Sequence, residues 1–147
     1  MSSDIEIISK LPYERPFLFV DSITSVDENG IEGEYKVRED EYFFQGHFPG
    51  NPVVPGVIIT EAMAQIGLVS LGIFMVGDTA GDVTPVFSSS QVEFLNVARP
   101  GDLLKVKSEK IYFRLNKLKC KVTCVNGKEE IIAKGELSGM MIKQPGN

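Results

Sequence analysis

Apolar and polar positions alternate with a period of two in several stretches of the chain, which predicts β-strands with one buried face. The clearest stretch is 31–37, where isoleucine, tyrosine and valine alternate with glutamates and a lysine. The run 16–27 before it is rich in β-forming residues, and the turn Asp27-Glu-Asn-Gly30 joins the two. We therefore predict that 16–27 and 31–37 form a hairpin.

Four more β segments crowd the C-terminal half, at about 86–97, 103–113, 118–125 and 130–142. Leucine, cysteine and valine alternate with lysines and a threonine in the third of these segments. The dipeptide Asn126-Gly127 that follows it is a strong signal for a tight turn. The last two strands are therefore predicted to pair as a hairpin.

The segment 56–76 has a different hydrophobic pattern, because apolar residues would occupy nearly every side of a helix formed by it. Good helix formers stand at its centre, Pro55 marks its start and Gly77 marks its end. A helix that is apolar all round has to be buried. We predict an α+β architecture, in which one long helix packs against a single, strongly curved antiparallel sheet.

A membrane span is the alternative interpretation of the same segment, since its length is about that of a bilayer crossing. Four polar residues interrupt it, namely Thr60, Glu61, Gln65 and Ser70. No lysine or arginine occurs between Arg38 and Arg99 to anchor or orient a span. The core helix is therefore the reading we prefer, with no membrane span.

The length and net charge of the chain indicate how many domains it has and which kinds of partner it can bind. Its 147 residues suit one domain, and we find no linker or internal repeat, so we expect a single domain over 1–147. The formal net charge is -5, and no stretch concentrates basic residues, which argues against nucleic acid. The first residues lack the basic and apolar regions of a secretory signal, so a cytoplasmic location is expected.

Only two cysteines occur, Cys120 and Cys124, both in the segment 118–125. On one face of a strand they would lie roughly 13 Å apart, which is too far for an unstrained disulfide. We interpret them as reduced core residues. A zinc site is the alternative, but there is no second cysteine pair, and the single histidine is remote in sequence. No metal is therefore expected.

Glu61 is the only charged residue among the thirty positions between His47 and Asp78. A lone carboxylate in a buried helix should have its pKa raised from about 4.3, because desolvation disfavours the ionised form. Such a group is suited to act as a general acid. Taken alone, Glu61 could equally be a structural or interface residue.

His47 stands in a loop that is rich in glycine and proline and leads into the helix, Gln45-Gly-His-Phe-Pro-Gly-Asn-Pro-Val-Val-Pro-Gly56. An isolated histidine is more often scaffold, but an imidazole titrates near neutral pH and can act as a base. The free amides at the start of the helix, near Gly56 and Val57, favour negative charge. A base, an acid and an oxyanion site are what proton abstraction next to a carbonyl requires.

The run from Phe43 to Gln65, which contains this loop and the start of the helix, resembles the signature of the (3R)-hydroxyacyl-[acyl carrier protein] dehydratases of fatty acid synthesis. The likeness extends to Leu11-Pro-Tyr-Glu-Arg-Pro-Phe-Leu-Phe-Val-Asp21 and to Arg99-Pro-Gly-Asp102. It covers roughly residues 8–142. The resemblance implies the hotdog fold, a sheet wrapped round a central helix.

The resemblance also implies roles for individual residues. His47 corresponds to the catalytic histidine and Glu61 to the catalytic carboxylate, which in this family come from opposite subunits of a homodimer. The backbone amide of Gly56 corresponds to the donor that holds the thioester carbonyl. Phe48 and Val57 correspond to positions that help to line the acyl tunnel. The dimers of this family often assemble three at a time into hexamers.

The implied reaction is the elimination of water from a 3-hydroxyacyl thioester, which gives the trans-2-enoyl thioester without a metal or organic cofactor. The acyl chain would be carried on the phosphopantetheine of an acyl carrier protein. Glutamate at position 61 matches the branch that only dehydrates, so isomerase activity is not expected. Two alternatives remain, namely a hotdog thioesterase and a non-catalytic protein that binds acyl carriers.

One stretch departs from the family pattern. Family members usually carry several basic residues before the Pro-Gly-Asp turn, where the acidic carrier docks, but in 90–99 only Arg99 is basic. Two acidic partners repel at long range. This departure indicates weak use of a generic carrier, or a dedicated carrier as in a secondary-metabolite pathway such as aryl-polyene assembly.

Overall fold

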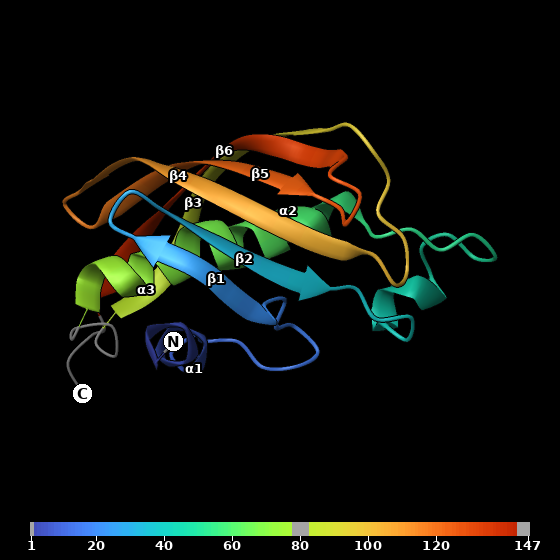
Figure 1. Cartoon of the computed structure of the whole chain (residues 1–147), viewed down its shortest axis with the longest axis horizontal. Helices are drawn as coiled ribbons and strands as arrows, with labels where there is room; N and C mark the ends of the chain where they lie inside the picture. Colours follow the sequence, from blue (N-terminus) through green and yellow to red (C-terminus); the bar gives the residue numbers. More distant parts are fainter. Residues whose placement is uncertain (1, 78–82, 144–147) are drawn as a thin grey trace.

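The computed structural model describes residues 2–77 and 83–143, so the predicted domain ends at 1 and 147 lie outside the described residues (Figure 1). The helical segments are α1 (Ser2–Ser9), the 3-10 turn η1 (Tyr42–Gln45), α2 (Gly56–Ala64), the π-helical turn η2 (Gln65–Val69) and α3 (Ser70–Val76). The strands are β1 (Ser22–Asp27), β2 (Gly30–Lys36), β3 (Val83–Phe94), β4 (Leu103–Arg114), β5 (Lys117–Val125) and β6 (Ile131–Lys143). The predicted α+β class is confirmed.

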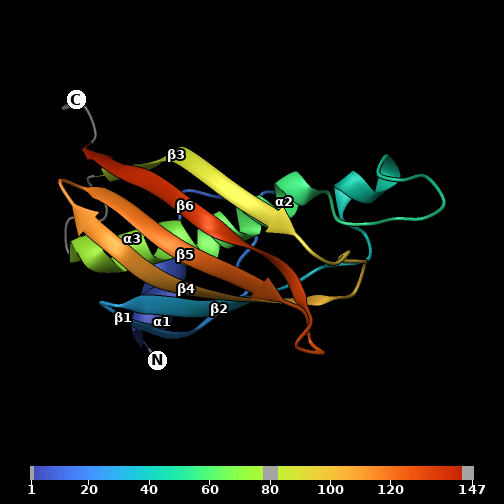
Figure 2. The same ribbon diagram turned by 90° about the horizontal axis from the view of Figure 1, so that it is seen from above.

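The strands form one antiparallel sheet in the order β1-β2-β4-β5-β6-β3. Both predicted hairpins, β1 with β2 and β5 with β6, are confirmed. The sheet curves over the helix α2–α3, which lies along its inner face (Figures 1 and 2). Strand β3 returns from the end of this helix and pairs with β6, so that β1 and β3 are the two edges of the described sheet.

The central helix runs without a break from Gly56 to Val76, but its middle turn is widened. The Gln65 carbonyl accepts hydrogen bonds from the Ser70 N–H and from the Ser70 hydroxyl, the latter at 2.7 Å. At this turn the helix lies against β4 and β5, and a Cβ on Gly67 would be only 3.0 Å from a methyl group of Val122. The glycine thus allows close packing, and the Gly67 carbonyl accepts a hydrogen bond from Ser108 Oγ at 2.7 Å.

The burial of this helix agrees with the preference for a core helix. Within the described residues, Gly56–Val76 is the one helix long and apolar enough to cross a membrane, and 72% of its most apolar window is buried inside the protein. The sheet therefore supplies the apolar surroundings that its composition requires. Cys120 and Cys124 also lie in this core as free, buried thiols. Burial raises their pKa to about 11 and about 12, which makes both thiols unreactive.

Two strands differ from the prediction by more than one residue, and one helix was not predicted. Strand β1 begins at Ser22, not at 16, because the Phe19 N–H is taken by a side chain of the helix and not by a neighbouring strand. Strand β3 lies three residues earlier than predicted, at Val83–Phe94. Helix α1 was not predicted; it packs against β1 and α3, with Ile7 buried.

Candidate active site

An open groove separates the start of α2 from the edge strand β3. Its lining comes from one end of each element: Gly56, Val57, Thr60 and Glu61 from the helix, and Phe87, Ser90, Val92 and Phe94 from the strand. The Phe94 ring packs so closely that a Cβ on Gly56 would be 3.2 Å from it. No described residue accepts a hydrogen bond from the Gly56 or Val57 N–H, so these amides are free to bind an anionic oxygen.

Glu61 lies one turn into α2, where its side chain is half-buried. Burial raises the pKa of its carboxyl above the ordinary value of 4.5, and a hydrogen bond from Gln65 lowers it in part. This is the shift that the isolation of Glu61 in the sequence predicted. The carboxyl can therefore hold its proton at a higher pH than an exposed glutamate can.

Gln65 fixes the orientation of Glu61. Its Nε2 donates to Glu61 Oε2 and to the Phe17 carbonyl, each at 3.0 Å, and its Oε1 accepts from the Phe19 N–H at 2.8 Å. The side chain has no exposed surface, so these bonds are shielded from water. Sequence reasoning had noted Gln65 only as one of four polar residues in the helix. One amide thus holds both the carboxylate and the loop before β1.

A second cavity of about 90 Å³, less open than the groove, also has Glu61 in its lining. Its lining comes from the helix, from β3 and from the ends of β5 and β6, and consists of Tyr13, Glu61, Ala64, Leu68, Val69, Pro85, Val86, Phe87, Leu118, Gly139, Met140 and Met141. Apart from Tyr13 and Glu61 these residues are apolar or glycine. Such a cavity suits an apolar chain whose polar end lies at Glu61.

His47 lies in the loop 46–55, which projects beyond the end of the sheet in both ribbon views (Figures 1 and 2). Its Nδ1 is 3.0 Å from the Val53 carbonyl oxygen, and its ring stacks on Phe48 with centroids 4.2 Å apart. A carbonyl can only accept, so Nδ1 carries the hydrogen and donates it. In the neutral ring Nε2 is then left with its lone pair, which is the form that a general base needs.

Three of the five predicted site residues meet in one chain. Gly56, Val57 and Glu61 line the groove, whereas neither His47 nor Phe48 lines the groove or the second cavity. Phe48 and Val57, the predicted tunnel residues, are 55% and 77% exposed. Among the described residues, no hydrogen bond joins His47 to Glu61: His47 bonds to the Val53 carbonyl, and Glu61 accepts from Gln65. Within the described residues, His47 and Glu61 thus share neither a hydrogen bond nor one of these two cavities.

The model of the FabA-like domain family matches residues 11–136. The chain belongs to the FabA-like family. Among its relatives, the 3-hydroxyacyl-[acyl-carrier-protein] dehydratase FabZ of Caldicellulosiruptor saccharolyticus is 42% identical over 134 residues, which are 89% of this chain and 92% of the relative. The enzyme of the same name from Caulobacter vibrioides is 37% identical over 139 residues, which are 94% and 87% of the two chains.

Solved structures show the fold that goes with this family. The dehydratase heterocomplex ApeI:P from Xenorhabdus doucetiae matches with a TM-score of 0.75 at 16% identity, over 96% of this chain and 91% of that one. A hypothetical thioesterase with coenzyme A from Streptococcus pneumoniae matches with a TM-score of 0.59 at 14% identity, over 84% and 87%. At such identities the likeness shows the fold alone, and the predicted hotdog fold is confirmed.

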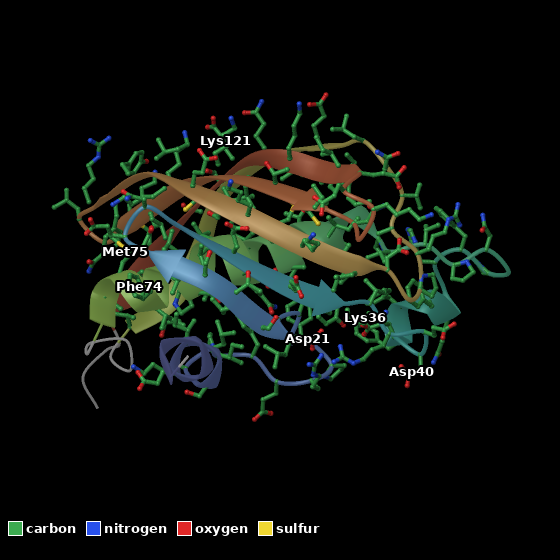
Figure 3. All side chains as sticks on the ribbon, viewed as in Figure 1. Asp21, Lys36, Asp40, Phe74, Met75 and Lys121 are labelled. Atoms are coloured by element: carbon green, nitrogen blue, oxygen red, sulfur yellow. The ribbon has the colours of Figure 1, made fainter. Side chains whose placement is uncertain are left out.

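The departure from the family pattern lies on the outer side of the groove strand. Gln91 and Glu93 of β3 line a surface hollow together with Lys121, Lys134 and Glu136. Lys121 extends from the face of the sheet that points away from the helix (Figure 3). The two side chains at positions where a basic strand is expected therefore lie beside two lysines and one glutamate from β5 and β6.

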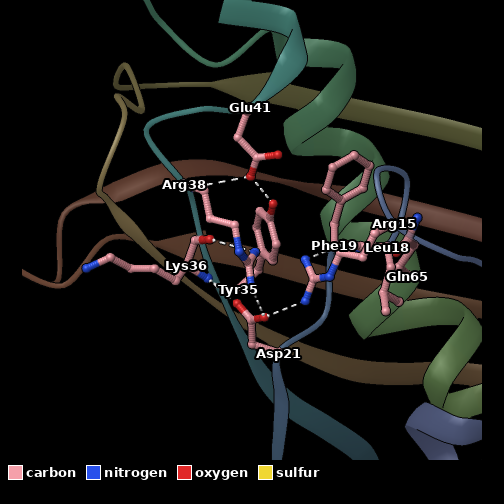
Figure 4. Close-up of polar contacts among 9 residues, drawn as sticks. All are labelled: Arg15, Leu18, Phe19, Asp21, Tyr35, Lys36, Arg38, Glu41 and Gln65. Carbon is pink, nitrogen blue, oxygen red and sulfur yellow. Dashed lines mark hydrogen bonds and ion pairs between the residues drawn. The ribbon is translucent and has the colours of Figure 1, made fainter.

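A cluster of charged residues fastens the loop before β1 to β2 (Figure 4). Asp21 Oδ1 accepts from Arg15 at 2.9 Å and from Arg38 at 2.8 Å, and Oδ2 accepts from the Lys36 N–H at 2.7 Å. Partial burial would raise the pKa of Asp21, but these hydrogen bonds lower it below its ordinary value. Tyr35 under Arg38 donates to Glu41. Sequence reasoning did not find this cluster, because its members meet only after β1 and β2 pair.

Proposed function

We propose that this protein is a (3R)-3-hydroxyacyl-[acyl carrier protein] dehydratase that produces trans-2-enoyl thioesters. The observation that carries the proposal is the place of Glu61. This carboxyl, with its raised pKa, stands where the groove at the start of α2 meets an apolar cavity. If the acyl chain occupies the cavity and the thioester lies at the free amides of α2, then C3 of the substrate, which lies between them, is placed at Glu61.

The proposed reaction needs only proton transfers. Neutral His47 removes the proton on C2, and the electron pair moves toward the thioester carbonyl, whose oxygen accepts a hydrogen bond from the Gly56 N–H. As the C2–C3 double bond forms, the C3–O bond breaks, and the Glu61 carboxyl protonates the departing hydroxyl to give water. His47 is left protonated and Glu61 ionised, and solvent restores both. No redox or metal chemistry is required for this step.

The proposal includes a homodimer in which His47 of one subunit meets Glu61 of the other. Support comes from the groove of one chain, which Glu61 lines and His47 does not, and from the projecting loop that carries His47. A two-fold arrangement would make two such sites from one interface. Phe48 and Val57, which are exposed in one chain, would then be covered as walls of the acyl tunnel. Three dimers could combine further into a hexamer.

The edge strand β3 is the surface we propose for this dimer. It is an edge strand of the described sheet, and its Val86, Phe87 and Phe94 are exposed apolar side chains. A long strand edge with apolar residues tends to pair with another chain. Because Phe87 and Phe94 also line the groove beside Glu61, pairing here would bring the second subunit to the site.

The proposed partner is an acyl carrier protein that delivers the acyl chain on phosphopantetheine, as the names of the curated relatives indicate. Glu93 is acidic and Gln91 is neutral, at positions of β3 where basic residues would attract an acidic carrier. We therefore expect a generic acidic carrier to dock only weakly. A dedicated carrier in a secondary-metabolite pathway would fit the same surface. The proposal places the enzyme in the cytoplasm, with its apolar helix inside the sheet.

A direct assay separates this proposal from the thioesterase reading. The purified protein is mixed with a 3-hydroxyacyl thioester, and the conjugated enoyl thioester is followed by its absorbance while a thiol reagent follows free thiol. Dehydration produces the absorbance without thiol, whereas thioester hydrolysis produces thiol without the absorbance. Thiol release alone would overturn the proposal in favour of a thioesterase. The absence of both signals would overturn it in favour of a protein that only binds acyl carriers.

A further inference from the structure

Two oxygen-bearing side chains line the second cavity beside the groove, Glu61 and Tyr13. The remaining lining residues offer no side-chain oxygen or nitrogen to a substrate. The cavity is therefore polar only at the end where the reacting part of an acyl chain would lie. The proposed mechanism uses Glu61 and leaves Tyr13 without a role.

Tyr13 is held in place from the same helix that carries Glu61. It lies in the loop before β1, where its ring is 6.4 Å from the Phe17 ring. Gln65 binds the Phe17 carbonyl and the Phe19 N–H on this loop, and Glu61 as well. A single buried amide thus ties Glu61 to the part of this loop on which the Tyr13 ring packs. Side chains fixed in this way are suited to act on one substrate atom.

The Tyr13 hydroxyl is available to a ligand. The side chain is half-buried and lines the cavity, and its hydroxyl makes no hydrogen bond with any residue in the described ranges. Because no unpaired side-chain oxygen of the described residues is fully buried, this hydroxyl is accessible from the cavity or from solvent. Burial, together with the nearby charge of Glu61, raises the pKa of Tyr13 to about 12. The hydroxyl therefore remains a neutral donor at any pH at which the enzyme would work.

We propose that the Tyr13 hydroxyl donates a hydrogen bond to the C3 oxygen of the substrate, beside the Glu61 carboxyl that protonates it. This inference rests on the proposed dehydratase function and adds a catalytic residue to it. As the C3–O bond breaks, negative charge grows on the oxygen until the proton from Glu61 arrives. A second donor stabilises that charge and holds the oxygen on the Glu61 side of the chain. Tyr13 gives up no proton, so water leaves with the proton from Glu61.

The first test is the kinetics of Tyr13→Phe, which removes only the hydroxyl. We expect kcat for dehydration to fall about ten- to a hundredfold with little change in KM, because the bond strengthens as charge develops. Tyr112→Phe is the matched control, since Tyr112 lies on β4 beside Arg114, outside the groove and the cavity. A Tyr13→Phe enzyme within twofold of wild type would overturn the inference.

The second test measures binding, so that it does not depend on turnover. In a His47→Ala background, a 3-hydroxyacyl thioester should bind about five- to tenfold less tightly when Tyr13→Phe is added, whereas the saturated acyl thioester should bind equally well with and without it. Equal losses for both ligands would mean that Tyr13 only packs the cavity, which would overturn the inference. Failure of the dehydratase proposal itself would show differently, as a wild-type protein that forms no enoyl product.

Discussion

Replacement of Gln65 with leucine tests whether one buried amide supports both the fold and the acid. The Phe19 N–H would lose its acceptor in the core, where Phe19 is fully buried. Glu61 would lose its 3.0 Å donor. The Phe17 carbonyl would also lose a donor, but Phe17 is 41% exposed, so water can replace that bond.

The structure allows the size of this effect to be worked out. An unsatisfied buried N–H and a lost hydrogen bond to a half-buried carboxyl together cost about 3 kcal/mol. For a domain of this size that corresponds to a fall in Tm of roughly 10 °C. Urea denaturation followed by circular dichroism measures the free energy of unfolding. Gln45→Leu is the matched control, since the Gln45 side chain makes no hydrogen bond with another described residue.

The same substitution should move the pH profile of dehydration. The Gln65 hydrogen bond lowers the pKa of Glu61, so its loss raises that pKa further. Glu61 acts in its protonated form, and activity therefore persists to higher pH on the alkaline side of the profile. This role for Gln65 would be refuted by two results together. The Gln65→Leu protein would have a free energy of unfolding within about 1 kcal/mol of that of the Gln45→Leu protein, and the alkaline side of its pH profile would be unchanged.

Three further predictions concern single side chains. His47→Ala and Glu61→Gln should each lower dehydration about 10²- to 10⁴-fold while the circular dichroism spectrum is retained, and more than half of wild-type activity in either would rule out the proposed site. Glu61→Gln should also unfold at higher urea at neutral pH: a raised native pKa makes wild-type stability fall as pH rises above about 4.5, and the variant should lack that fall. Glu93→Lys should speed association with a generic acidic carrier at low salt, whereas Glu32→Lys on β2 should not; equal rates would place docking on another surface.

Much of the fold could be predicted because each element keeps the same pattern of burial along its whole length. Strands β2 and β5 alternate between the core and water, and the helix 56–76 is surrounded by the sheet. The edge position of β3 could not be predicted, since strand order depends on pairing across the whole chain. The widened turn at Gln65–Val69 also depends on packing against β4 and β5, which no local pattern records.

The candidate site was predictable to a similar extent. Glu61 stood out because burying a single charged group in a long apolar segment costs free energy, which indicates a function for that group. The raised pKa of its carboxyl agrees with burial. Gln65 and Tyr13 did not stand out. Their importance comes from contacts with a loop and a cavity that form only when residues distant in sequence pack together. Such contacts have no periodic signature.

The most direct test of the central claim is complementation between inactive subunits. His47→Ala and Glu61→Gln proteins are mixed under conditions in which subunits exchange, and exchange is verified by mass spectrometry. In each mixed dimer one site inherits both defects and the other inherits neither, so random exchange should restore activity to roughly a quarter of wild type. Proof of exchange with activity no higher than that of the separate variants would contradict the account, because His47 and Glu61 would then have to act within one chain.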